Sequence, residues 1–185
     1  MRKLSATQLR FGFTVLCLLA EISLLLWEHF HGGIKSHHVL HRPDLPAVSN
    51  ALGLLLLPAL AWWASTQVLK RMAAKQNSST GLADVPISAL FGFTGALIIG
   101  GLLAFGFSQG YTDFTGYLFQ AMFLLAIALP AYRAETLLGF VLAMNIVFGA
   151  VLPAAIGGLL VALSAITHFI LWPLLVRCWS GCVRR

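Results

Sequence analysis

The chain has 185 residues, of which 59% are hydrophobic and only 10% carry a charge, and its mean hydropathy is +0.87. Soluble globular domains average about 45–50% apolar and about 25% charged residues, so the composition excludes a water-soluble fold and predicts an integral membrane protein. The formal net charge of +6 comes from basic residues beside apolar segments, where the positive-inside rule and anionic headgroups account for them. The sequence has no basic patch interleaved with aromatic residues, so no nucleic-acid partner is expected.

Six apolar segments follow one another along the chain, at 11–28, 51–69, 86–107, 117–132, 136–154 and 156–176. Each has a length near the roughly 20 residues that a helix needs to cross the hydrocarbon core, and 117–132 is the shortest. Only Pro153-Ala154-Ala155 separates the last two, and Gly157-Gly158 follows. Proline and paired glycines break helices, which favours a tight hairpin here over one long helix. The sequence therefore predicts one all-α domain over 1–185, a bundle of six transmembrane helices.

The distribution of lysine and arginine predicts the orientation of this bundle. Six crossings leave only Lys35 and Arg42 on one side of the membrane, and such a bias marks the opposite side as cytoplasmic. The ten basic residues on that opposite side are Arg2, Lys3, Arg10, Lys70, Arg71, Lys75, Arg133, Arg177, Arg184 and Arg185. We therefore expect both termini in the cytoplasm of a bacterial-type inner membrane. The first segment contains Glu21 and has no small-residue cleavage site, so an uncleaved helix is expected.

Histidines are concentrated in the loop after the first apolar segment, which this topology places outside the cytoplasm as segment 28–50. Five of the six histidines lie between His29 and His41. Imidazole is the commonest protein ligand for transition metals, and carboxylates complete many such sites. The loop therefore predicts a site for a transition metal ion such as Zn, Cu or Fe. Its candidate ligands are His29, His31, His37, His38, His41 and Asp44.

The spacing of these histidines suggests how they would converge. A helical turn over 37–41 would put His37 and His41 on one face, whereas an extended stretch would do the same for His29 and His31. Gly32-Gly33 would let the chain fold back between the two groups. Two alternatives remain, namely proton sensing, since imidazole has an unperturbed pKa of about 6.5, and a purely structural use at the membrane interface.

Three polar residues fall inside the apolar segments at similar depth. Counted from the basic flanks, Glu21, Asn145 and His168 lie roughly 13–18 Å into a core about 30 Å thick. A carboxylate facing lipid is costly, so we expect Glu21 to face the bundle interior within interaction distance of His168, the ionisable group at matching depth, with Asn145 as a nearby amide. Glu28, seven residues after Glu21 and on nearly the same helical face, would connect this pair to the histidines. Glu21, Glu28 and His168 are thus the candidate catalytic residues, unless the Glu21–His168 pair only holds two helices together.

The third segment carries a small residue at every fourth position, at Gly92, Ala96, Gly100 and Ala104. Such a stripe lets another helix approach closely. It predicts a homo-oligomeric contact, a substrate path, or ordinary packing inside the bundle.

Two functions of different classes fit these features. The first is a metal-binding protein or metal-dependent, hydrolase-like membrane enzyme, in which the ion activates water against a lipid-soluble substrate. The second is a small oligomeric transporter or channel for a small solute, a cation or protons, with the external histidines as a pH gate. Membrane lipids are expected partners in both.

Overall fold

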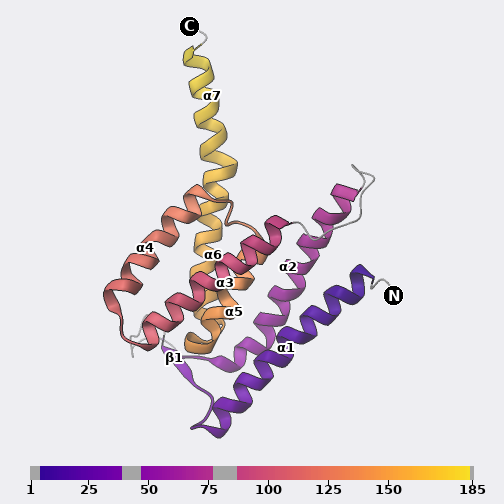
Figure 1. The fold of residues 1–185 in the computed structure, drawn as a ribbon, viewed down its shortest axis with the longest axis vertical. Coiled ribbons are helices and arrows are strands. Elements are labelled where there is room, and N and C mark those ends of the chain that lie inside the picture. Colours follow the sequence, from indigo (N-terminus) through magenta and orange to yellow (C-terminus); the bar gives the residue numbers. More distant parts are fainter. Residues whose placement is uncertain (1–4, 39–46, 77–86, 184–185) are drawn as a thin grey trace.

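The computed structural model describes residues 5–38, 47–76 and 87–183, and Figure 1 shows that most of this chain forms a bundle of helices. The prediction of an all-α fold is confirmed. The helices are α1 (Ala6–Phe30), α2 (Gly53–Gln76), α3 (Ile87–Ser108), α4 (Thr112–Ala128), α5 (Ala134–Phe148), α6 (Val151–Ile166) and α7 (Trp172–Val183), with a short 3-10 helix, η2 (Asn50–Leu52), and a π-helical segment, η3 (Thr167–Leu171).

Four segments of the described chain are long and apolar enough to cross a membrane: Ala6–Phe30, Asn50–Ala74, Ile87–Ser108 and Val151–Arg177. The apolar helices α4 and α5 are shorter, at 17 and 15 residues. Large hydrophobic side chains such as Leu55, Phe91 and Leu159 are exposed on the outside of the bundle, which water would disfavour and lipid would not. These features indicate a multi-pass membrane protein. Six complete crossings and cytoplasmic termini stay predictions.

Helix α5 is the centre of the bundle and packs against α2, α3 and α6. It runs parallel to α3, because Gly92 lies near Thr136 and Gly100 near Phe140 and Ala143. It runs antiparallel to α2, where Arg71 meets Glu135. The bundle therefore has one end marked by Arg71, called the Arg71 end below, and an opposite end.

The small-residue stripe of α3 packs inside the bundle. Ala96 and Ala104 are buried, and Gly92 and Gly100 lie against α5. Small side chains at these positions allow the close approach of the two helices. This contact accounts for the stripe within one chain, and the homo-oligomer stays a prediction.

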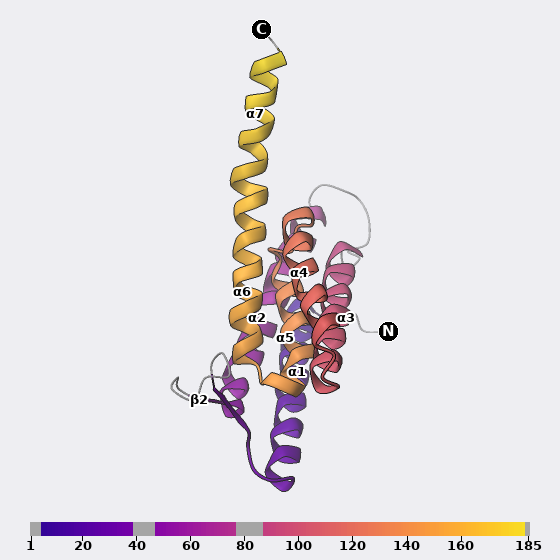
Figure 2. The same cartoon turned by 90° about the vertical axis from the view of Figure 1, so that its left-hand side faces the viewer.

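The hairpin between α5 and α6 exists, but its predicted position is wrong. The chain reverses at Gly149, which has a φ of +68°, a conformation that glycine adopts without the strain a side chain would bring. Pro153 lies in the first turn of α6, where its missing N–H would have no intrahelical partner in any case. Gly157 and Gly158 are inside α6, which continues through η3 into α7. Figure 2 shows this continuous helix extending beyond the other helices.

A short β-hairpin lies at the end of the bundle opposite Arg71, called the hairpin end below. Strand β1 (Ser36–His38) pairs antiparallel with β2 (Ala47–Ser49), with His37 opposite Val48. Gly32 and Gly33 have φ values of +117° and +99°, so they reverse the chain after α1 as predicted. The predicted helical turn starting at His37 is wrong, because residues 36–38 are extended.

Candidate functional site

The buried face of α1 carries two carboxyl groups. Its buried residues are Cys17, Glu21, Leu25 and Glu28, whose spacing of three or four places them on one side of a helix. Glu21 is 1% exposed and Glu28 is 2% exposed. The prediction that Glu21 and Glu28 share an inward face is therefore confirmed, and neither carboxyl faces lipid.

Glu28 has a hydrogen-bond donor on each carboxylate oxygen. Its Oε1 accepts from Nδ2 of Asn50 at 2.8 Å, and its Oε2 accepts from the backbone N–H of Lys35 at 3.2 Å. Its backbone carbonyl also accepts from the N–H groups of His31 and Gly33. Glu28 thus links the residue before β1 and the first residue of η2 to the end of α1. These bonds account for a buried carboxylate in structural terms.

Within the described residues, only one of the two carboxyl oxygens of Glu21 has a hydrogen-bond partner. Nδ2 of Asn145, on α5, donates to Glu21 Oε2 at 2.5 Å. Among the described residues, Glu21 Oε1 and Asn145 Oδ1 are both buried and have no hydrogen-bond partner. A side chain at Gly53 of α2 would overlap Oε1, so this glycine provides the space that the carboxyl occupies. Three helices therefore enclose one incompletely satisfied carboxyl group.

The surroundings of Glu21 contain no opposite charge within the described part of the chain. Glu135 shows the alternative, because this buried carboxylate forms an ion pair with Arg71. Among the described residues, Glu21 has only the Asn145 amide as a polar partner. A buried carboxylate without a counter-ion is costly in a low-dielectric interior. Glu21 is therefore the group in this bundle whose charge is least compensated by its described neighbours.

The predicted pairing of Glu21 with His168 is wrong, and the observed partner is Asn145, the amide predicted to lie at a similar depth. His168 lies in η3, where its Nδ1 is 2.9 Å from the backbone carbonyl of Ser164 and its ring contacts Tyr132. It is seventeen residues past the start of α6, about 26 Å along the helix, whereas Asn145 lies just before the turn into α6. His168 is consequently at the Arg71 end, away from Glu21.

The two described histidine side chains of segment 28–50 do not converge. His29 lies in the last turn of α1 and His31 is its C-cap, and helical residues two apart do not face each other. The predicted extended arrangement of this pair is therefore wrong. His31 stacks on Trp27, with 4.6 Å between ring centroids, and its Nδ1 is 2.8 Å from the Trp27 carbonyl.

The metal site itself is only partly covered by the structure. The described residues contain no group of three or more His, Cys, Asp or Glu placed to hold a metal ion. His41 and Asp44 lie outside the described residues, as do the side chains of His37 and His38. A metal site built from them stays a prediction.

Sequence reasoning missed the residues that shape the carboxyl sites. Asn50 is 4% exposed and binds Glu28, and its Oδ1 occupies space that a side chain at Gly149 would need. In the same way, Glu21 Oε1 occupies space that a side chain at Gly53 would need. The sequence signal for both is an amide immediately before an apolar segment, with a glycine three residues later.

The Glu21–Asn145 pair can hold a carboxyl group in two states. An asparagine amide can donate to a carboxylate or, after rotation, accept from a carboxylic acid. One neighbouring side chain is thus compatible with Glu21 both with and without a proton.

Comparison of the chain with known protein families, characterised proteins and solved structures found no match.

Proposed function

We propose that this multi-pass membrane protein is a small proton-coupled carrier that takes up and releases its proton at Glu21. The observation that carries the proposal is a carboxyl group that is 1% exposed, bonded through one oxygen to an amide, and free of any described counter-ion. A charged side chain at the centre of a membrane helix costs about 2.5–3.5 kcal/mol even on lenient scales. Protonation removes that charge, so binding of a proton changes the energy of this site strongly.

Glu28 and the hairpin end support a direction for proton entry. Glu28 is seven residues from Glu21 on the same buried face, which is about 10 Å closer to the hairpin end. Basic residues mark the other end: Arg10 lies over the Trp62 ring, 3.9 Å from its centroid, and Arg71 pairs with Glu135. We assign the Arg71 end to the cytoplasm of a bacterial-type inner membrane. Protons would then reach Glu21 from outside, past the histidine segment.

A metal-dependent hydrolase would need ligands that lie outside the described residues. The uncompensated carboxyl of Glu21, in contrast, is fully within them. The proposal of proton-coupled transport therefore rests on the contacts of Glu21 and Asn145, which the structure describes.

The first test is labelling with dicyclohexylcarbodiimide, an apolar reagent that modifies protonated carboxyl groups. Protein in proteoliposomes is expected to carry the adduct on Glu21, and labelling should fall as pH rises because the proton is lost. Mass spectrometry of peptides locates the adduct. Glu21→Gln should abolish it, whereas the matched variant Glu28→Gln should retain it. Labelling confined to Glu28 or Glu135 at every pH contradicts the proposal.

The second test separates proton binding from transport. Proteoliposomes containing a pH-sensitive dye are given an organic cation, an amino acid or a sugar, and the carrier should change the internal pH with at least one of them. Glu21→Gln should lower the rate at least about tenfold, the loss of a contribution near 1.4 kcal/mol. If Glu21 is labelled by the carbodiimide but no class of solute moves protons, Glu21 binds protons and the carrier assignment is wrong.

A further inference from the structure

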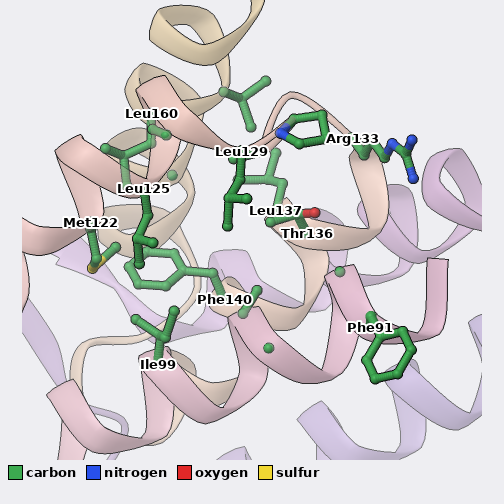
Figure 3. A pocket seen from close by; sticks show the side chains of 18 of the residues that line it. Phe91, Ile99, Met122, Leu125, Leu129, Arg133, Thr136, Leu137, Phe140 and Leu160 are labelled. Carbon is green, nitrogen blue, oxygen red and sulfur yellow. The ribbon is translucent and has the colours of Figure 1, made fainter. Parts of the chain in front are cut away.

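A second feature, separate from Glu21, is a mostly apolar cavity of about 410 Å³ between α3, α4, α5 and α6. Figure 3 shows side chains from these helices lining it, with Ile99, Met122 and Phe140 near one end and Arg133 near the other. Binding sites for small molecules span about 300–1,000 Å³, and this cavity is in the lower part of that range. Glu21 does not line it, so a ligand bound in this cavity would be independent of the proposed function.

Helix geometry explains why the cavity exists. Helices α3 and α4 touch where Gly106 packs against Thr115. Further from that contact the small residues Gly92, Gly95 and Ala96 line the cavity from α3. A Cβ atom at Gly95 would meet nothing within 4 Å. Gly95 therefore borders open space and does not pack tightly against a neighbouring helix.

The dimensions of the cavity suit one alkyl chain. Its lining on α3 runs from Ser88 to Ile99, eleven steps of 1.5 Å and hence about 16 Å along the axis. Spread over that length, the volume of about 410 Å³ forms an elongated cavity, a shape that fits an extended alkyl chain.

Polar residues, one of them cationic, border the end of the cavity near Arg133. Arg133, Ser88 and Thr136 line it there. Arg133 immediately precedes α5, and its side chain does not cap that helix. The nearby carboxylate of Glu135 is already paired with Arg71, so it does not neutralise Arg133. Charge and hydroxyl groups at one end and apolar side chains at the other match a molecule with an anionic head and an apolar tail.

We infer that this cavity binds a long-chain fatty acid, with its carboxylate at Arg133 and its chain extending toward Ile99 and Met122. The planar guanidinium of arginine matches a carboxylate through two parallel hydrogen bonds. Arg133 lies at the Arg71 end, the same end as the other basic side chains. A fatty acid in the adjoining leaflet would therefore meet the cavity with its head at the correct level.

The experiment uses a palmitic acid analogue with a diazirine in mid-chain and the purified full-length protein in phosphatidylcholine nanodiscs. Irradiation followed by peptide mass spectrometry is expected to place adducts on the cavity-lining stretches of α3 and α4, and unlabelled palmitate should compete. Gly95→Leu and the smaller change Gly95→Val fill the cavity and should lower labelling at least about tenfold. Gly101→Leu is the matched control, because Gly101 is on the same helix, lies outside the cavity lining and also has open space around its Cβ position. It should label like the unchanged protein.

The head-group assignment is tested with Arg133→Gln and with the corresponding photoreactive alcohol. Loss of the charge-assisted contact should lower labelling by the acid about tenfold, and leave the weaker labelling by the alcohol unchanged. Labelling that is unaffected by Gly95→Leu, or spread evenly over lipid-facing helices, overturns the site. Competition by lysophosphatidic acid but not by palmitate shows a phosphate-headed occupant and overturns the fatty-acid assignment. Unfolding midpoints close to that of the unchanged protein exclude misfolding as the cause of lost labelling.

Discussion

Replacing Asn145 by leucine is expected to lower the free energy of unfolding by about 1–3 kcal/mol, because the buried carboxyl of Glu21 then loses its polar partner. Removing both groups should cost less than removing Asn145 alone, since Glu21→Met with Asn145→Leu leaves two apolar side chains of similar size. The pair need not add net stability, because both groups lose hydration on burial. The single change should cost more than the double change because it leaves the Glu21 carboxyl group buried without a polar partner. Titration of detergent-solubilised protein with a denaturing detergent measures each value.

The control for this cycle is His168→Leu. His168 bonds to a backbone carbonyl of its own helix and contacts Tyr132, so its loss should change stability by no more than about 0.5 kcal/mol. It should also be additive with Glu21→Met, because the two side chains share no partner. Coupling of Glu21 to His168 instead of Asn145 would contradict the site described above.

The first three long helices could be predicted from the sequence because polar segments separate their apolar runs. The boundary between α5 and α6 could not, because Pro153 is the more obvious helix breaker but the chain reverses at Gly149. A proline in the first turn of a helix is compatible with the helix, and a sequence does not show which glycine will adopt a positive φ. The helical hairpin of α5 and α6 could be predicted, but the residue at which the chain reverses could not.

The candidate site could likewise be predicted only in part. Glu21 could be predicted to face inward, because a lipid-facing carboxylate is costly, and Asn145 could be placed at its depth. Depth counted from Arg177 misplaces His168, because that count assumes that the last helix begins to cross the membrane at Arg177. The continuous helix from Val151 to Arg177 is longer than one crossing requires, so a basic residue near its end is a poor marker of depth.

Gly139→Ala is expected to lower the free energy of unfolding by about 1–3 kcal/mol. Gly139 is on the central helix α5, and a Cβ there would overlap the backbone carbonyl of Phe93 on α3. Backbone atoms cannot rotate away as a flexible side chain can. The two parallel helices would have to separate, and the packing between Gly100 and Phe140 would loosen with them.

Gly101→Ala is the matched control for Gly139→Ala. Gly101 lies within α3, and an added Cβ would meet nothing within 4 Å. Alanine favours a helix over glycine by up to about 1 kcal/mol, so this change should be neutral or stabilising. The same chemical substitution should therefore be destabilising at Gly139 and neutral or stabilising at Gly101 when unfolding is measured under identical conditions. Stabilisation by both changes would mean that α3 and α5 do not approach at Gly139, and the central position of α5 would then have to be abandoned.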